Sequence, residues 1–335
     1  MRILYISPDC NYSDGVSKHV FVSMKNLSQD TDYKLFFITN KGDSFDRLQN
    51  IPGLNFSLLN FEKDHKNIFN MITDSFKLYS FCKQNKIDII HTHHRYPELL
   101  SVFVSKFARV KTITTVHSFV RGMKLFSFRS DKIISVSKAV ESHLIKNYPH
   151  TKENCTTIYN CIEESFYAKS EVDNLELRKS LGFSDADKIL LFAGRISKIK
   201  GCDILIEAFK KLPQNLNAKL LLIGSVSEPY INSLLEKNRG KIKLLEPQKD
   251  LKPYYEISDL VVLPSIEDPF PYVMLEAGAM KKPFIGGNTG GIKEFIDDNV
   301  NGFLVTPGNV DELSYKIKYV LENPDVAKKK KKKLF

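Results

Sequence analysis

Short apolar runs alternate with longer amphipathic stretches along the whole chain. The short runs predict strands that are buried on both faces, as in a parallel sheet, and apolar residues spaced three or four apart predict helices between them. In the first half, the predicted strands are residues 3–6, 34–39, 87–91, 111–115 and 132–136, and the predicted helices are 16–27, 68–85, 98–108 and 137–147.

A second series of the same kind follows. Its predicted strands are residues 188–193, 219–223, 241–244, 260–263 and 283–286, and its predicted helices are 201–211, 229–238, 251–257, 272–280 and 310–321. Two such arrays in tandem predict an α/β protein with two doubly wound parallel sheets. We expect one domain over residues 1–160, a second over 161–327 and a basic tail over 328–335, with the polar stretch 160–184 as the linker and the entry into the second domain.

The charge of the chain is unevenly distributed. The 335 residues are 42% hydrophobic and 26% charged, as in globular proteins, and the formal net charge is +10. The lysine run 328–333 supplies six of these charges, and residues 101–152 hold ten basic side chains against two acidic ones. One local surface, rather than the whole protein, is therefore expected to be basic, and the chain has no recognisable nucleic-acid-binding module. We expect no nucleic-acid partner.

The cysteines and the apolar runs indicate a cytoplasmic protein. Five cysteines without a CxxC pair favour neither a disulfide framework nor a zinc ribbon. The apolar run before Pro8 is too short for a signal peptide, and no run approaches the roughly 18 residues of a membrane span.

The glycine-rich fingerprints of several large enzyme classes are absent. The chain after the first predicted strand has no GxGxxG, which disfavours a nicotinamide or flavin enzyme. Residues 286–291 have the glycine spacing of a P-loop, but Ile292 stands where its lysine is required. An ordinary NTPase is therefore also disfavoured.

Three segments after predicted strands of the second domain carry candidate chemistry. Residues 194–201 place Arg195 and Lys200 at the start of a helix, where they would hold a diphosphate unless the segment is only a solvated basic turn. Residues 264–276 present Asp268 and Glu276 around a proline-containing turn, either for sugar hydroxyls or as a helix cap and a surface glutamate. Four glycines in 286–291 suit close backbone approach to a ligand or a plain strand-to-helix connection.

In this order and spacing, the three segments resemble the C-terminal half of the GT-B glycosyltransferases, in particular family 4 of the retaining enzymes. The N-terminal half resembles the same family in the segments 14–19, 88–93, 115–118, 135–137 and 158–160. The resemblance covers nearly the whole chain. It implies the GT-B fold, in which two Rossmann-like domains face a cleft where the chemistry takes place.

The resemblance implies a role for each matching residue. Arg195 and Lys200 match the positions that hold the donor diphosphate and neutralise the leaving group. Asp268 and Glu276 match the two acids of the family's Glu-x7-Glu pattern, which contact the donor sugar and the nucleotide ribose. The other implied donor-binding residues are Gly15 in the N-terminal loop, Glu267, and Phe270, Pro271, Tyr272 and Val273, which bring backbone N–H groups to sugar and phosphate.

The chain departs from the family pattern at three places. Asp268 is shorter than the usual glutamate by a methylene, which leaves open whether Glu267 shares its role or the sugar sits differently. Asp14 replaces the first of two usual glycines, and Cys161 stands where a glycine often follows Asn160. None of these changes removes a required charge.

All eight histidines lie within residues 1–150. The alternation His91-Thr92-His93-His94 could suggest a metal site on one strand face, but no carboxylate or cysteine is positioned to complete it, so polar packing at a strand end is expected and no metal is predicted. His117 matches the family's Thr-Val-His position. The resemblance implies that it faces the sugar and donates to a hydroxyl or to the developing charge; the alternative is a purely structural histidine.

Together the matches imply a retaining transferase that moves a hexose or N-acetylhexosamine from a nucleotide diphosphate sugar to an acceptor hydroxyl. We expect a UDP-sugar donor, no metal or other cofactor, and a role in assembling bacterial-type cell-surface polysaccharide, glycolipid or glycoprotein. Another enzyme of the same fold that acts on sugar nucleotides or phosphates, an epimerase or a phosphorylase, is the alternative.

Residues 118–129 interleave Phe, Leu and Met with Arg and Lys. This pattern suits a segment at the surface of an anionic membrane, where a lipid-linked acceptor would be presented at the inner face of the cell membrane. An ordinary loop packed on the N-terminal core is the alternative. The acceptor is expected to be a glycan, a lipid-linked molecule or a protein.

Overall fold

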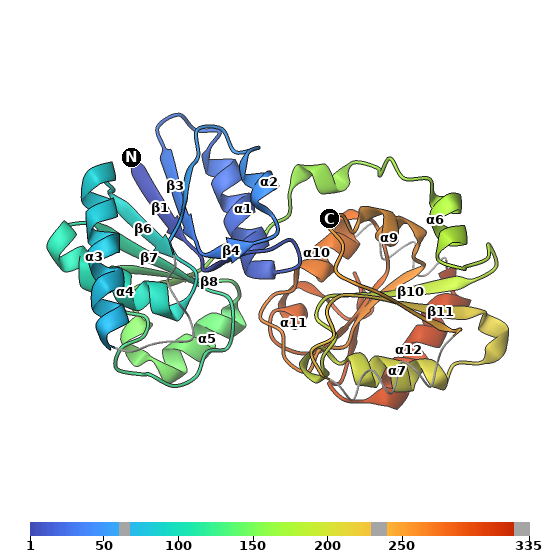
Figure 1. Ribbon diagram of the computed structural model, residues 1–335. Coiled ribbons are helices and arrows are strands. Elements are labelled where there is room, and N and C mark those ends of the chain that lie inside the picture. Colours follow the sequence, from blue (N-terminus) through green and yellow to red (C-terminus); the bar gives the residue numbers. More distant parts are fainter. Residues whose placement is uncertain (60–67, 229–239, 325–335) are drawn as a thin grey trace. The chain divides into compact units, whose positions relative to one another are not determined.

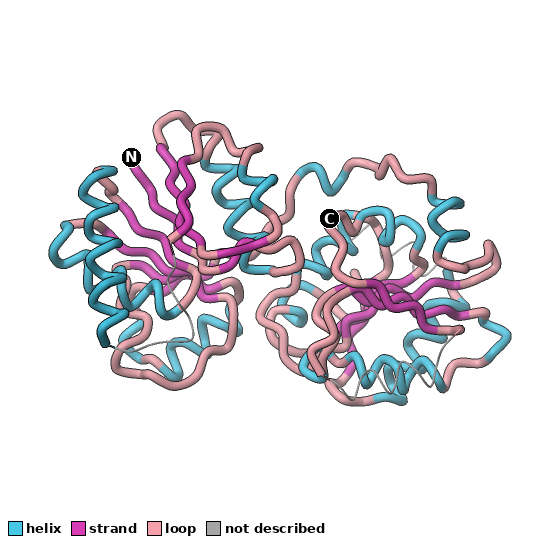
Figure 2. The backbone as a smooth tube through the Cα atoms, viewed as in Figure 1, coloured by secondary structure: helices cyan, strands magenta, loops and turns pink. Residues whose placement is uncertain are grey.

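The computed structural model describes residues 1–59, 68–228 and 240–324. The chain divides into two compact units, Met1–Cys161 and Ile162–Phe335. Each unit holds a parallel sheet with helices on both faces (Figures 1 and 2). The predicted fold class, with two doubly wound parallel sheets, is confirmed. The predicted helix 229–238 and the predicted tail 328–335 lie outside the described residues.

The first unit is built on a seven-stranded parallel sheet of order β5-β3-β1-β6-β7-β8-β9. The chain steps outward from β1 on one side and then returns to build the other side, so the topological switch point lies between β1 and β6. The strands are β1 (Arg2–Ile6), β3 (Lys34–Thr39), β5 (Asn55–Leu58), β6 (Ile89–Thr92), β7 (Lys111–Val116), β8 (Lys132–Ser135) and β9 (Cys155–Thr157), with a separate small pair of β2 (Asp9–Cys10) and β4 (Lys41–Gly42).

Alternate residues of the central strand enter two different cores. Leu4 and Ile6 belong to the core beneath α3 and α4, whereas Ile3 and Tyr5 belong to the core beneath α1 and α2. A strand covered on both faces is apolar at every position, which is the pattern seen in the sequence. The helices of this unit are α1 (Gly15–Leu27), α2 (Phe45–Leu48), α3 (Ile68–Asn85), α4 (Arg95–Ala108), α5 (Lys138–Asn147) and the 3₁₀ turn η1 (Pro149–Thr151).

The second unit has a six-stranded parallel sheet of order β12-β11-β10-β13-β14-β15, with its switch point between β10 and β13. The strands are β10 (Lys188–Ala193), β11 (Ala218–Ile223), β12 (Ile242–Leu245), β13 (Leu260–Leu263), β14 (Phe284–Gly287) and β15 (Phe303–Val305). The α-helices are α6 (Asn174–Ser180), α7 (Cys202–Lys210), α9 (Lys252–Ile257), α10 (Tyr272–Ala279), α11 (Ile292–Phe295) and α12 (Val310–Glu322), and the 3₁₀ turns are η2 (Glu164–Tyr167), η3 (Lys198–Lys200) and η4 (Gln214–Leu216).

The stretch 160–184, predicted as the linker and the entry into the second domain, lies almost wholly within the second unit, which begins at Ile162. It contains η2 and α6, and it is bonded to α9 and its end: Arg178 donates to the carbonyl of Ile257 at 3.1 Å, and the Ser170 N–H donates to Glu256 at 2.6 Å. These contacts are polar, so they leave no apolar periodicity by which the sequence could have revealed them.

Candidate functional site

The three candidate segments of the second unit meet at the carboxyl edge of its sheet. Residues 194–201 follow β10, residues 264–276 follow β13, and residues 286–291 include the end of β14. The Ile266 N–H donates to the carbonyl of Ile199 at 2.9 Å. At Gly201, where φ is +71°, a Cβ would lie 2.1 Å from the Pro264 carbonyl oxygen. Glycine therefore permits the first two segments to touch beside the switch point.

An ion pair between Lys200 and Asp268 lies at the centre of this edge. Lys200 Nζ is 2.7 Å from Asp268 Oδ2, and the exposed fractions of the two side chains are 22% and 2%. Ser265 Oγ donates to the same carboxylate oxygen at 3.1 Å. Because a buried carboxylate needs a charged or hydrogen-bonding partner, Asp268 holds the lysine ammonium in a fixed place.

Glu276, on α10, is also held by a side chain that sequence reasoning missed. Its carboxylate is buried, and Tyr255 Oη of α9 donates to Glu276 Oε2 at 2.7 Å. Burial and the adjacent carboxylate raise the pKa of Tyr255 well above its ordinary value, so the phenol keeps its proton and remains a donor. A tyrosine at a buried helix position carries no signal in the sequence that separates it from ordinary core packing.

The other predicted donor-binding residues surround this pair. Arg195 is exposed, Glu267 is half-buried, and Phe270 and Pro271 are buried. Tyr272 and Val273 form the first turn of α10, which has no side-chain cap, so its first N–H groups are not bonded by a capping residue. Within the described part of the chain, the buried Ser197 Oγ has no hydrogen-bond partner. This hydroxyl is a further polar group next to η3 that the sequence did not single out.

The first unit places Gly15 at the start of α1, where it is exposed. Asp14, which departs from the family pattern, is the N-cap of this helix. Its carboxylate accepts hydrogen bonds from both the N–H and the hydroxyl of Ser17, each at 2.8 Å. The presence of aspartate at this position therefore has a local structural explanation, because its carboxylate satisfies an otherwise unbonded N–H at the start of the helix.

His117 follows β7 and lies in a cluster of imidazoles. Its Nε2 is 3.1 Å from His93 Nδ1, and its ring centroid is 4.8 Å from that of His19. Burial first, and then neighbouring histidines, lower the pKa of His117 well below its ordinary value. The neutral ring has one N–H to donate and one lone pair. His91 shows the expected strand-end packing, with Nε2 2.8 Å from Thr115 Oγ1.

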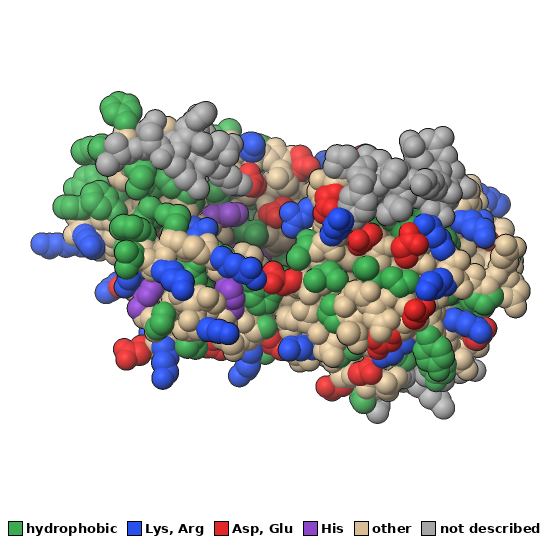
Figure 3. Space-filling view, turned by 90° about the horizontal axis from the view of Figure 1, so that it is seen from below, with side chains coloured by type: hydrophobic (Ala, Val, Ile, Leu, Met, Phe, Trp, Pro, Cys, Tyr) green, Lys and Arg blue, Asp and Glu red, His purple; other side chains and the backbone are tan. Residues whose placement is uncertain are grey.

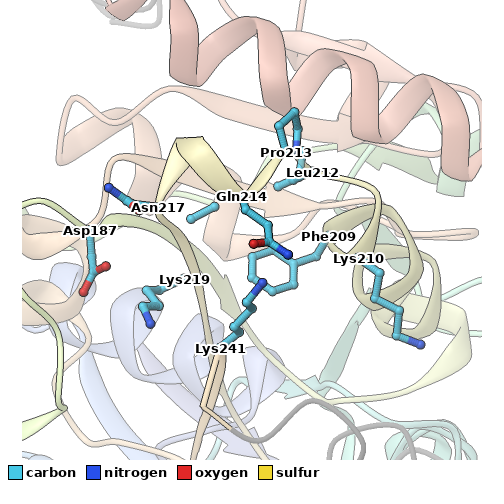
Figure 4. Close-up of a pocket in the computed structure, with 10 residues that line it drawn as sticks. Asp187, Phe209, Lys210, Leu212, Pro213, Gln214, Asn217, Lys219 and Lys241 are labelled. Atoms are coloured by element: carbon cyan, nitrogen blue, oxygen red, sulfur yellow. The ribbon is translucent and has the colours of Figure 1, made fainter.

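A surface groove of about 300 Å³ lies at the opposite edge of the second sheet (Figure 4). Asp187 precedes β10, Lys219 is near the start of β11 and Lys241 precedes β12, so these lining residues mark the amino edge of the strands. The groove is therefore separate from the carboxyl-edge residues described above, and we do not assign the donor chemistry to it.

Solved structures that share the fold of this chain are GT-B glycosyltransferases. Family models match both halves of the chain: Glycosyltransferase Family 4 over residues 13–166 and Glycosyl transferases group 1 over residues 173–334. The chain belongs to this glycosyltransferase family, and it has the GT-B fold.

Two relatives and one solved structure show the extent of the similarity. The N-acetyl-alpha-D-glucosaminyl L-malate synthase of Bacillus anthracis is 31% identical over 70% of this chain and 65% of its own length. The lipopolysaccharide 1,2-N-acetylglucosaminetransferase of Salmonella typhimurium is 31% identical over 61% of this chain and 57% of its own length. Both alignments thus span less than two thirds of the relative. The Anabaena protein Alr3699/HepE, solved with UDP and glucose, has a TM-score of 0.83 and 20% identity over 99% of this chain and 93% of that chain.

The close contact at Gly201 leads to a stability prediction. Gly201→Ala would force a Cβ against the Pro264 carbonyl, in addition to the cost of a positive φ, and we expect the free energy of unfolding to fall by more than about 3 kcal/mol. Gly182→Ala is the matched control, because Gly182 has a φ of +79° but open space around it. It should lose only about 1 to 2 kcal/mol. Equal losses in urea denaturation would show that the contact with Pro264 does not constrain the fold.

Proposed function

We propose that the protein transfers a hexose or N-acetylhexosamine from a UDP-sugar to an acceptor hydroxyl, with retention of the anomeric configuration. The observation that carries this proposal is the Lys200–Asp268 pair at the carboxyl edge of a glycosyltransferase sheet, with the buried Glu276 one turn into the helix α10 that follows Asp268. The UDP and glucose in the Anabaena structure, and the N-acetylglucosaminyl relatives, support the choice of donor.

In this proposal the donor rearranges the ion pair. Arg195 and Lys200 bind the diphosphate together with the uncapped N-terminus of α10. When the phosphate shares the Lys200 ammonium, the Asp268 carboxylate becomes available to accept a hydrogen bond from a sugar hydroxyl. Glu276, oriented by Tyr255, accepts hydrogen bonds from the ribose hydroxyls.

The chemical step breaks the bond between the anomeric carbon and the phosphate oxygen, forms a bond from that carbon to the acceptor oxygen, and releases the acceptor proton. Negative charge grows on the departing diphosphate, and the two basic side chains stabilise it without a metal ion. We further propose that His117 and Gly15 of the first unit reach the donor sugar, the histidine donating its N–H to a hydroxyl.

The donor assignment is tested by thermal shift with UDP-, GDP- and ADP-sugars, followed by mass and anomeric analysis of the products. We expect UDP-sugars to raise the melting temperature most and to yield an α-configured glycoside from an α-linked donor. Lys200→Ala should lower turnover by about 100-fold or more, and Lys198→Ala, two residues away and exposed, should not.

Because Lys200→Ala also leaves a buried carboxylate unpaired, the double variant Lys200→Ala/Asp268→Asn serves as a second test. It should recover stability but not turnover. Near-normal transfer by a folded Lys200 variant would overturn the phosphate role, whereas free UDP without a glycoside, or a need for inorganic phosphate, would favour an epimerase or a phosphorylase.

The Tyr255–Glu276 bond leads to a prediction about binding rather than turnover. Tyr255→Phe removes the donor to Glu276, so the KM for the nucleotide sugar should rise about 5- to 10-fold with little change in kcat. Tyr254→Phe is the control, because the neighbouring tyrosine bonds to Gln248 instead. A selective loss of kcat, or equal effects of both variants, would argue against a role in holding Glu276 for the ribose.

We also propose that residues 118–129 meet an anionic membrane at the inner face of the cell, where a lipid-linked acceptor is presented. The exposed fractions of Met123, Leu125 and Phe126 are 52%, 75% and 60%. Figure 3 shows that hydrophobic side chains lie beside lysine and arginine side chains on one face of the first unit. Exposed apolar groups among cations suit the interface of an anionic bilayer. Among the described helices, none is long and apolar enough to span a membrane.

Hydrogen bonds with side chains of α4 and of the residue after α5 hold the backbone of residues 118–129 in place, which supports a defined docking surface. The buried Glu98 accepts hydrogen bonds from the N–H groups of Phe128, Arg129 and Ser130 at 3.0, 2.7 and 3.2 Å. Tyr148 Oη donates to the Gly122 carbonyl at 2.7 Å. Met123, Leu125 and Phe126 are therefore exposed on a loop whose backbone is held by hydrogen bonds, whereas Phe128 of the same segment is buried and packs against Tyr148, as the alternative of an ordinary loop expects for that residue.

Vesicle sedimentation tests this surface. Neutralising Arg121, Lys124 and Arg129 together with glutamine should weaken binding to phosphatidylglycerol vesicles roughly 100-fold, at about 1 kcal/mol per charge. Leu125→Ser/Phe126→Ser should weaken it as well, whereas Tyr315→Ser, which changes an equally exposed aromatic of the second unit, should not. Removal of residues 328–335 should leave binding in place. No binding of the native chain to these vesicles would reject the proposal.

A further inference from the structure

Three histidines from three separate elements converge in the first unit. His19 lies on α1, His93 directly after β6 and His117 directly after β7, so the latter two mark the carboxyl edge of the sheet. One nitrogen of each ring lies within 4.8 Å of the others. His93 Nδ1 and His117 Nε2 are 3.1 Å apart. Within the ranges that the structure describes, no acidic or cysteine side chain belongs to this group.

The ring spacing matches that of a three-histidine metal site. With Zn–N bonds of about 2.0 to 2.1 Å, two nitrogens on a tetrahedral ion stand about 3.4 Å apart and the ring centroids about 5.2 Å apart. The three centroid distances are 5.5 Å for His19–His93, 4.8 Å for His19–His117 and 5.4 Å for His93–His117. The spacing of the three rings is therefore already close to that of a coordinated set.

The surroundings of the rings suit coordination. His19 Nδ1 is 3.1 Å from Asn160 Oδ1, and an acceptor on the second ring nitrogen is the usual support of a metal-bound histidine. His93 is 4% exposed, and within the described residues its Nε2 has no hydrogen-bond partner. His19 and His117 are half-buried, which leaves the group open to solvent. Burial lowers the pKa of all three rings.

We propose that His19, His93 and His117 form a site for one Zn²⁺ or similar nitrogen-preferring dication, with an open fourth position, and that its occupancy withdraws His117 from the donor sugar. The second half of this proposal depends on the proposed function, in which His117 contacts the sugar. The ion is thus an inhibitor of transfer and not a participant in it. The strand pattern His91-Thr92-His93 does not describe the site, because His91 is not one of the three ligands.

Metal binding is measured on chelator-treated full-length protein in a Cys161→Ser background, which removes the exposed thiol. We expect one Co²⁺ per chain with the intense visible spectrum of a tetrahedral site, and its displacement by one Zn²⁺. His19→Gln and His93→Gln should each weaken Zn²⁺ binding about tenfold or more in a chelator competition. His19 is only half-buried, so His19→Gln should fold even if His93→Gln is unstable, and the test then depends on His19→Gln alone. His143→Gln, whose ring bonds to the Val120 carbonyl, should bind Zn²⁺ like the parent.

Sugar transfer is the second readout, with each variant compared with its own zinc-free rate. Zn²⁺ should inhibit the parent and His143→Gln, and the inhibitory concentration should rise about tenfold for His19→Gln. An octahedral Co²⁺ spectrum, the absence of stoichiometric binding, or equal affinity of parent and His19→Gln would overturn the site. Tight Zn²⁺ binding with unimpaired transfer would overturn the inhibitory role alone. If no nucleotide sugar serves as a donor, the proposed function fails while the binding result still decides the site.

Discussion

The parallel direction of the strands is the constraint on which the candidate chemistry of this protein depends. In a parallel sheet the carboxyl ends of all strands lie at the same edge. The segments that follow β10, β13 and β14 therefore all begin at that edge. Residues far apart in the chain, such as Lys200 and Asp268, thereby become neighbours at 2.7 Å. The same rule in the first sheet brings the loops after β6 and β7 together, and with them His93 and His117. Catalytic and binding groups can therefore vary on a scaffold whose strands remain core.

The Lys200–Asp268 pair of the second unit is nearly self-neutral before any ligand is bound. A lysine with 22% exposure opposite a carboxylate with 2% exposure presents little net field, although each group is costly to bury alone. Such a pair attracts simple anions only weakly. A ligand can separate the two side chains if its phosphate binds the lysine and its hydroxyls donate hydrogen bonds to the carboxylate. A nucleotide sugar is a ligand of that kind. In the proposed function, the pair thereby favours a compound with both groups over simple phosphate.

Much of the architecture follows from the sequence. Residues 34–39, 68–85, 188–193 and 260–263 have the predicted type and the predicted bounds, because central strands and long amphipathic helices show their burial directly in apolar periodicity. The short strands β5, β9 and β15 were missed. They lie at the edges of the sheets, where only one neighbour pairs with them and the apolar signal is weak. For the site, the motif residues could be named, but not their partners: Tyr255 and the imidazole of His19 reach their places through tertiary packing, which single-sequence patterns do not encode.

The loop before β8 has a consequence for the thermodynamics of docking. Met123 and Phe128 both have positive φ values, 50° and 60°, which are unfavourable for residues with side chains and persist only where the surroundings hold them. Glu98 stabilises this conformation because its carboxylate accepts hydrogen bonds from three successive N–H groups at the end of the loop. The backbone is thus ordered before any surface is met, and association need not supply the conformational entropy of folding the loop. For the proposed membrane contact, a few exposed side chains on such a loop suffice for attachment that is reversible.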